Sequence, residues 1–173
     1  MREKKGLILG LISFTVIGVL IAGIFLYNAT KPINIPNQLI FNTIDGKTQT
    51  FKHYKGINGT VVIFTATWCT YCKDEIKKAK PLYEKYLAKG IQFLMIFQDY
   101  DVDTIHNYRK ANKIPWPVVQ KTDYVMEIFR RKGTGVPSAY FISQNGDVIA
   151  NLAGKNSTEH YPEVIERLLQ DAN

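Results

Sequence analysis

The longest run of apolar positions lies near the start of the chain. Residues 7–27, LILGLISFTVIGVLIAGIFLY, carry no charge over 21 positions. At about 1.5 Å of rise per residue, a helix of this length spans the roughly 30 Å hydrocarbon core of a bilayer. A cleaved signal peptide is the alternative. The apolar region of a signal peptide is usually shorter, and it ends in a cleavage site made of small residues. This chain has Tyr27 where cleavage would need a small residue. The pattern therefore predicts an uncleaved transmembrane helix over residues 6–27.

Charges on either side of this run predict its orientation. Arg2, Lys4 and Lys5 precede it, whereas Lys31 alone follows closely. Because basic residues favour the cytoplasmic side, residues 1–5 are expected in the cytoplasm. The rest of the chain is expected on the periplasmic or extracytoplasmic side of the cell membrane, as a single-pass protein.

The remaining chain divides into a linker and one domain. Residues 28–37 contain Pro32 and Pro36, which favour an extended linker. The domain is expected over residues 38–173. Short apolar strand patterns alternate there with helical patterns, which predicts an α/β sheet with helices on both faces. Strands are expected at 39–41, 49–53, 60–65, 91–97, 118–119, 138–142 and 147–152, and helices at 69–88, 101–112, from Asp123, and from Asn156 or Ser157.

Local signals place turns and helix ends within this domain. Asp45-Gly46 and Asn145-Gly146 are typical of hairpin turns. Asp123 is expected to cap a helix, and Pro81 is expected to kink the helix over 69–88.

The charge composition indicates which classes of partner the protein could bind. The 22 lysines and arginines exceed the 15 acidic residues, which gives a formal charge of +7. A mildly basic surface attracts acidic partners or anionic head groups. No basic stripe with interleaved aromatic residues is present, which argues against nucleic-acid binding.

The candidate chemistry lies in Trp68-Cys69-Thr70-Tyr71-Cys72, which holds the only two cysteines. The segment stands where a β-branched run gives way to a helical pattern. The N-terminus of that helix favours an anion, and the thiolate is the form of cysteine that attacks disulfides. Two intervening residues allow the second sulfur to reach the first and resolve a mixed disulfide. The segment therefore predicts a redox-active dithiol.

Two structural interpretations compete with the dithiol. A structural disulfide would close a very short loop and would restrict the unfolded chain little. A structural zinc site normally needs four ligands, whereas His53, His106 and His160 are scattered without ligand spacing. No metal and no cofactor beyond the cysteine pair is expected.

Several motifs in order resemble the thioredoxin superfamily, and most closely its membrane-anchored TlpA/ResA-type thiol–disulfide oxidoreductases. They are Asp45-Gly46-Lys47, the run VVIFTATWCTYC, the segment IPWPVV at 114–119 and GVPSAYFISQNGDVI at 135–149. The resemblance covers about residues 37–173. It implies a thioredoxin-like fold, a central mixed sheet flanked by helices, preceded here by one transmembrane helix.

The resemblance also implies roles for individual residues. Cys69 would be the attacking thiolate and Cys72 the resolving thiol. Pro137 would be a cis-proline facing the cysteines. Val136 would offer backbone groups to an extended substrate segment, with Thr70 and Tyr71 also contacting the substrate.

Two further residues have a supporting role in this resemblance. Trp68 would pack beside the active site, and ordinary core packing is also compatible with it. Glu75 matches a glutamate that influences the ionisation of the cysteines. The alternative is a first-turn acid that complements the helix dipole.

The chain departs from the superfamily pattern at three places. Pro81 comes nine residues after Cys72, where the pattern usually has its helix proline about five after, which predicts a shifted kink. Ile63 stands where thioredoxin itself has a buried acid, so proton relay by that acid is absent. Thr70 and Tyr71 replace the common proline-containing pair, and this pair tunes the redox potential.

The resemblance implies an extracytoplasmic reductase of protein disulfides, with cytochrome c maturation as a candidate process. Its partners would be a disulfide-containing client protein and a membrane electron donor that re-reduces the pair. A disulfide oxidant or isomerase is the nearest alternative. A copper metallochaperone on the same fold is a less favoured alternative, because such proteins usually have CxxxC spacing and an added histidine. This chain has CxxC spacing and no histidine in the loop before Pro137. A binding module with a vestigial active site is the remaining alternative.

Overall fold

The computed structural model describes residues 16–24, 33–130 and 135–172. The chain separates into two compact units, Met1–Pro32 and Ile33–Asn173. Residues 16–24 are helical. No helix among the described residues has the length and apolar character needed to cross a membrane. Most of the anchor predicted over residues 6–27 lies outside the described residues.

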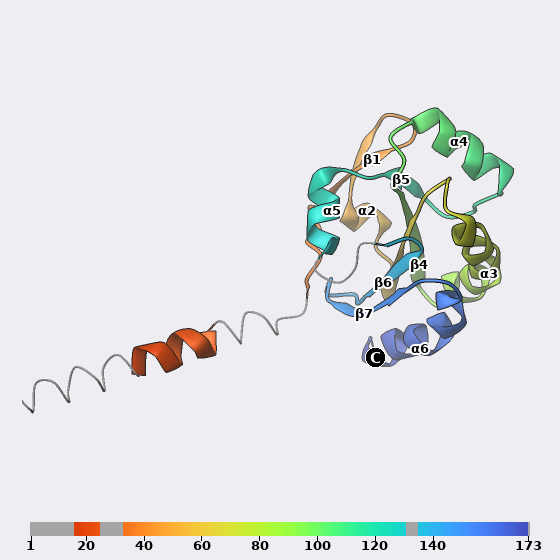
Figure 1. Ribbon diagram of the computed structural model, residues 1–173. Helices are drawn as coiled ribbons and strands as arrows, with labels where there is room; N and C mark the ends of the chain where they lie inside the picture. The colour runs from red at the N-terminus through yellow and green to blue at the C-terminus, as the bar shows by residue number, and fades with distance from the viewer. Residues whose placement is uncertain (1–15, 25–32, 131–134, 173) are drawn as a thin grey trace, which may run out of the picture. The chain divides into compact units, whose positions relative to one another are not determined.

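A seven-stranded mixed sheet forms the centre of the second unit (Figure 1). Its strand order is β2-β1-β5-β4-β3-β6-β7. Strands β3, β4 and β5 run parallel, and the other neighbours pair antiparallel. The bounds are β1 Ile40–Thr43, β2 Thr48–Thr50, β3 Gly59–Thr65, β4 Ile91–Phe97, β5 Val118–Gln120, β6 Ser138–Ile142 and β7 Val148–Ala153.

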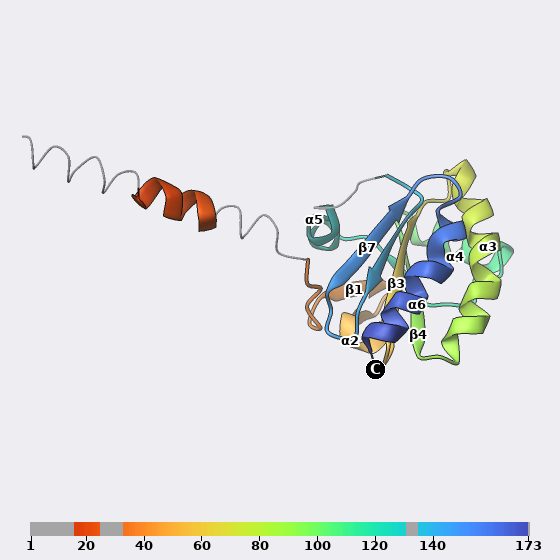
Figure 2. The same ribbon diagram turned by 90° about the horizontal axis from the view of Figure 1, so that it is seen from below.

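Helices cover both faces of this sheet, as the sequence predicted (Figure 2). Successive residues of a strand point to opposite faces, so Val61 and Ile63 of β3 face one core while Val62 and Phe64 face the other. Helices α3 (Thr70–Leu87), α4 (Val102–Ala111) and α6 (Tyr161–Asp171) pack on the first face, and α2 (Phe51–Tyr54) and α5 (Asp123–Arg130) pack on the second. All seven residues of β3 are buried, which explains its continuous apolar pattern.

The segment just before β1 belongs to the domain, although the sequence assigned it to the linker. Ile33 and Ile35 are buried, and Asn34 between them forms a β-bridge with Asp147. The Ile35 amide also donates to the Gly146 carbonyl at 2.7 Å. This alternation is a strand pattern, and the two prolines obscured it in the sequence.

The predicted second hairpin arm over 49–53 is wrong beyond Thr50. Residues from Phe51 to Tyr54 form α2 instead. Phe51 and Tyr54 lie three residues apart, so a helical turn directs both rings toward Phe41. Burial of both rings outweighs the strand propensity of the sequence.

Two helix starts differ in detail from the predictions, and the kink predicted at Pro81 stays a prediction. Thr122, not Asp123, caps α5, because its hydroxyl accepts from the Val125 amide at 3.2 Å. Asn156 has a left-handed backbone without a side-chain cap and precedes a short 3-10 helix, η1 (Ser157–His160), before α6 begins. Pro81 lies inside α3, which continues past it to Leu87.

Candidate active site

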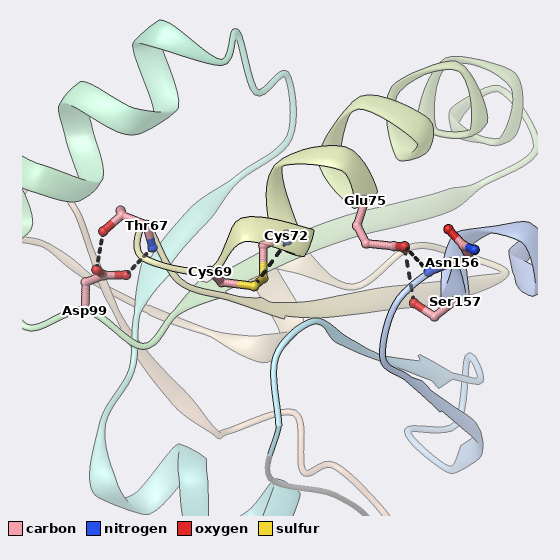
Figure 3. Close-up of a disulfide and its surroundings, with 7 residues drawn as sticks. All are labelled: Thr67, Cys69, Cys72, Glu75, Asp99, Asn156 and Ser157. Atoms are coloured by element: carbon pink, nitrogen blue, oxygen red, sulfur yellow. Dashed lines mark hydrogen bonds between the residues drawn. A yellow bond between two sulfur atoms is a disulfide. The ribbon is translucent and has the colours of Figure 1, made fainter.

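The two cysteines lie where β3 ends and α3 begins, and they form a disulfide (Figure 3). Cys69 is the N-cap of α3, and its sulfur accepts a hydrogen bond from the Cys72 amide at 3.1 Å. An acceptor at this position meets the unpaired amides and positive end of an 18-residue helix. The same contacts favour a thiolate on Cys69 after reduction.

The two sulfurs differ in their access to solvent. Cys69 keeps 8% of its surface exposed, whereas Cys72 keeps 1%. A partner approaching from outside therefore reaches Cys69 first. This difference agrees with Cys69 as the attacking residue and Cys72 as the internal resolving residue.

The loop before β6 packs directly against the cysteines. The Val136–Pro137 peptide bond is cis, as predicted. Val136 is partly buried and packs against Ala66, Cys69 and Cys72. The Pro137 carbonyl accepts from the Gly154 amide at 2.9 Å, which ties the loop to the end of β7. Residues 131–134, which precede this loop, lie outside the described residues.

Three predicted site residues lie at the surface beside the disulfide. Trp68 is 67% exposed and Tyr71 is 51% exposed, and Thr70 between the cysteines is also exposed. Core packing of Trp68 is therefore wrong, because its side chain leaves the turn before α3 toward solvent. The Lys155 ammonium lies 5.5 Å from the centroid of the Tyr71 ring. These aromatic rings offer contact area to a partner that reaches Cys69.

Glu75 is buried, with 3% of its surface exposed, and its carboxylate points away from solvent toward the loop after β7. It accepts hydrogen bonds from the Asn156 amide at 2.7 Å and the Thr158 amide at 2.9 Å. The hydroxyls of Ser157 and Thr158 donate at 3.1 Å and 2.5 Å. The alternative of a first-turn acid is wrong for Glu75, because α3 begins at Thr70 and its first turn contains no acidic residue. All four donors to Glu75 lie on a segment distant in sequence.

A buried tyrosine lies near this carboxylate. Burial raises the pKa of Tyr161 well above its usual range, and the negative charge of Glu75 raises it further. A hydrogen bond with Ser157 acts in the opposite direction. The Tyr161 hydroxyl therefore stays protonated at neutral pH.

A second carboxylate, which the sequence interpretation did not identify, holds the loop before the cysteines. Asp99 accepts from the Thr67 amide at 2.9 Å and from the Thr67 hydroxyl at 2.5 Å. The Gln120 side-chain amide in turn donates to the carbonyls of Asp99 and Tyr100. Figure 3 shows Thr67 and Asp99 on one side of the disulfide and Glu75 with Asn156 and Ser157 on the other. Asp99 lies two residues after the end of β4, and the parallel neighbour of β4, β3, leads into the active-site turn. Because the ends of neighbouring parallel strands lie at the same edge of a sheet, this position after β4 is the sequence signal that could have identified Asp99.

The described residues contain no group of three or more histidine, cysteine, aspartate or glutamate side chains placed to hold a metal ion. The chemistry that their geometry supports is thiol–disulfide exchange at Cys69, with internal resolution by Cys72.

Comparison with known proteins agrees with this chemistry. The AhpC/TSA family model matches residues 33–151. A relative from Bacillus thuringiensis subsp. konkukian, named thiol-disulfide oxidoreductase ResA, is 28% identical over 134 residues, which cover 77% of this chain and 75% of the relative.

Solved structures confirm the predicted fold class. A thiol:disulfide interchange protein of the thioredoxin family from Chlorobium tepidum TLS superposes with a TM-score of 0.69 at 26% identity, covering 81% of this chain and 98% of that one. A second structure from Chlorobium tepidum, described as a putative thiol:disulfide interchange protein DsbE, superposes with a TM-score of 0.67 at 19% identity, covering 82% and 96%. The fold of the domain is therefore thioredoxin-like.

Proposed function

The chain belongs to the AhpC/TSA family and is a thioredoxin-like thiol–disulfide oxidoreductase, and on that premise we propose that it reduces disulfides of client proteins outside the cytoplasm. The observation that carries this proposal is the cysteine pair at the N-terminus of α3, with Cys69 the more exposed of the two at 8% against 1% for Cys72.

The reaction proceeds in two exchanges. The Cys69 thiolate attacks one sulfur of the client disulfide, a new S–S bond forms, and the other client sulfur leaves as a thiolate that takes a proton from water. Cys72 then loses its proton to water and attacks the Cys69 sulfur. The mixed disulfide breaks, and the first client sulfur leaves as a second thiolate and is protonated. Two electrons pass from the cysteine pair to the client.

The residues around the pair hold the client during the first exchange. Val136 supplies backbone groups to an extended client segment, next to the cis peptide bond at Pro137. Trp68, Thr70 and Tyr71 give exposed contact surface on the α3 side of Cys69. Val136 packs against the cluster that contains both cysteines, which supports a position for the client backbone beside the reacting sulfur.

Glu75 acts on the cysteines through the position of α3. It lies one helical turn after Cys72, and its carboxylate is fixed by the segment 156–158. These bonds hold the turn of the helix that carries the resolving cysteine.

The apolar run over residues 6–27 anchors the protein in the cell membrane, with residues 1–5 in the cytoplasm. Disulfides persist in oxidising compartments, so a reductase there needs a supply of electrons. A dithiol donor in the membrane re-reduces the Cys69–Cys72 disulfide. The resemblance to TlpA/ResA-type proteins makes apocytochrome c a candidate client.

Trapping tests this function. In a Cys72→Ser variant the second exchange is blocked, so mixed disulfides between Cys69 and clients should accumulate in membrane preparations. They should appear as bands on non-reducing gels that disappear on reduction. The matched Cys69→Ser variant should give none. Equal adducts in both variants, or none in either, would contradict the proposal.

The reduction potential separates a reductase from an oxidant. A value near about −270 mV suits a reductant, and one near about −120 mV suits an oxidant. Equilibration with glutathione buffers measures it directly.

A further inference from the structure

Two adjacent surface depressions border the N-terminal half of α3, directly beside the cysteine pair. The first is lined by Tyr71 and Glu75, and both depressions are lined by Asp74 and Lys77. Each has a volume of about 400 Å³. Six lysines from three separate segments contribute to their walls, and we call them the lysine patch: Lys73, Lys77, Lys78, Lys80, Lys113 and Lys155.

The lysine patch carries a net positive charge. Asp74 is the exposed acid in its walls, and the second acid, Glu75, is buried and bonded to the segment 156–158. Lys78 pairs with Glu159 at 3.0 Å. Within the described part of the chain, none of the other five lysines has an ion pair. The half-buried Lys80 donates to the Asn112 carbonyl, so the charge available to an external partner is carried mainly by Lys73, Lys77, Lys113 and Lys155.

The patch is continuous with the reacting site. Tyr71, which lies between the two cysteines in sequence, lines the first depression, and the Lys155 ammonium lies over its ring. Lys73 directly follows Cys72 and is exposed. A client segment that occupies this depression therefore contacts a residue of the Cys69–Cys72 motif itself, Tyr71.

Three aspartates lie on the other side of the disulfide, where the Lys121 ammonium also lies 3.9 Å from the centroid of the Tyr100 ring. Asp99 lies there against Thr67 (Figure 3), and Asp101 and Asp103 follow at the start of α4. A partner crossing the disulfide thus meets lysines on the α3 side and carboxylates on the α4 side. Such a field favours one orientation of a charged partner over the reverse.

We propose that the lysine patch binds an acidic segment next to the cystine of a protein partner, and so selects clients whose disulfide is flanked by glutamate or aspartate on one side. This inference rests on the proposed reductase function and names its substrate class. A protein is favoured over a lipid surface because Tyr71, which lies between the two cysteines in sequence, lines the first depression, and a bilayer covering it would hinder access of clients to Cys69.

The expected effect is on encounter and orientation. Single exposed ion pairs contribute little, but several lysines of one sign raise the local concentration of an acidic partner and its association rate. The effect must weaken with salt, because exposed charges are screened.

A kinetic comparison tests the proposal on the reduced full chain. Two peptides share one intramolecular disulfide and differ in carrying glutamates or lysines on one side of it. A neutral dipyridyl disulfide serves as the reference probe. Wild-type protein should reduce the acidic peptide about tenfold faster than the basic one at low salt, and the ratio should approach one near about 1 M salt.

Two triple variants test whether the preference for the acidic peptide depends on the lysine patch. Replacing Lys73, Lys77 and Lys155 by glutamine should remove most of the preference. Replacing Lys52, Lys85 and Lys89, which are exposed elsewhere on the domain, removes the same charge and should preserve the preference. Circular dichroism confirms that each variant is folded, and the salt dependence of the wild type tests the idea without any substitution.

The outcomes separate the two proposals. If neither peptide nor the neutral probe is reduced, the reductase function itself fails. If both peptides are reduced at equal rates, or the control triple variant loses the preference equally, the docking surface is refuted while the function stands.

Phosphatidylglycerol vesicles test the lipid alternative. If they slow reduction of the acidic peptide while phosphatidylcholine vesicles do not, the patch serves a lipid surface and the protein partner is refuted. An unchanged rate supports the proposal.

Discussion

Glu75 is held by donors that all come from one distant segment. Its carboxylate accepts from two backbone amides and two hydroxyls of residues 156–158. A buried carboxylate with this many donors joins the first turns of α3 to the start of η1. Because Cys72 lies one turn earlier on the same helix, these bonds also fix the position of the resolving sulfur.

Substitution of Glu75 by glutamine should lower the stability of the domain. The variant keeps one acceptor oxygen but turns an NH₂ group toward amides and hydroxyls that need an acceptor. The variant loses hydrogen bonds to a charged group and gains one unsatisfied donor. We therefore expect the free energy of unfolding to decrease by about 2–4 kcal/mol. Urea denaturation of the oxidised protein measures it.

Glu159 provides the control for this prediction. It lies near the same segment but is exposed and pairs with Lys78 at the surface. Its replacement by glutamine should change the free energy of unfolding by less than about 1 kcal/mol. A similar loss in both variants would show that the four buried bonds do not stabilise the domain.

At the scale of elements, the ends of two parallel strands position the active-site turn. The Gln98 amide donates to the Thr65 carbonyl at 2.9 Å, which extends the pairing of β3 and β4 beyond both strands. The Asp99 carboxylate then accepts hydrogen bonds from the amide and the hydroxyl of Thr67. The turn that carries Cys69 is thus attached to the sheet on the side away from α3.

An Asp99→Asn variant should loosen this turn. The amide offers one acceptor where the carboxylate satisfies both Thr67 donors. Since a bond to a charged group contributes about 1.5–3 kcal/mol, exchange of the Thr67 amide hydrogen should accelerate about tenfold or more. Hydrogen–deuterium exchange followed by NMR gives this rate.

Asp103 offers a matched control for the loop variant. It lies in the first turn of α4 and is exposed. Asp103→Asn should leave exchange at Thr67 within about twofold of the wild type, because its side chain accepts no hydrogen bond within the described residues. Unchanged exchange in the Asp99 variant would mean that the sheet alone holds the turn.

At the scale of the whole molecule, the compact domain starts at Ile33. Ile33 and Ile35 join the core on the α2 and α5 face, and the Val148 amide donates to the Ile33 carbonyl at 2.8 Å. The segment 33–35 therefore lies against the start of β7, more than 100 residues away in sequence.

Two truncated chains test this boundary. A chain of residues 33–173 should fold cooperatively and reduce a neutral disulfide. A chain of residues 38–173 loses two buried isoleucines and should be less stable by about 3 kcal/mol or more. Urea unfolding followed by far-ultraviolet circular dichroism compares them. Equal stability would place the boundary after residue 37 instead.

Much of the architecture was predictable because it follows local patterns. The continuous apolar runs of β3 and β4 and the periodic apolar positions of α3 depend on residues close in sequence. The exceptions were short segments. Residues 51–54 contain strand-forming side chains, but the rings of Phe51 and Tyr54 are buried against a neighbouring strand by a helical turn. Tertiary packing outweighs propensity most easily where an element is short.

The sequence by itself determined the cysteine pair and its place between a strand and a helix, since each depends on a contiguous motif. The resemblance to the thioredoxin superfamily added the cis-proline loop beside the pair. Only the tertiary structure decided what surrounds the pair. Thr67 meets Asp99 across 32 residues, and Glu75 meets Thr158 across 83. The lysine patch likewise gathers side chains from three separate segments. Such contacts depend on how the strands and helices pack together, and no local pattern in the chain records that arrangement.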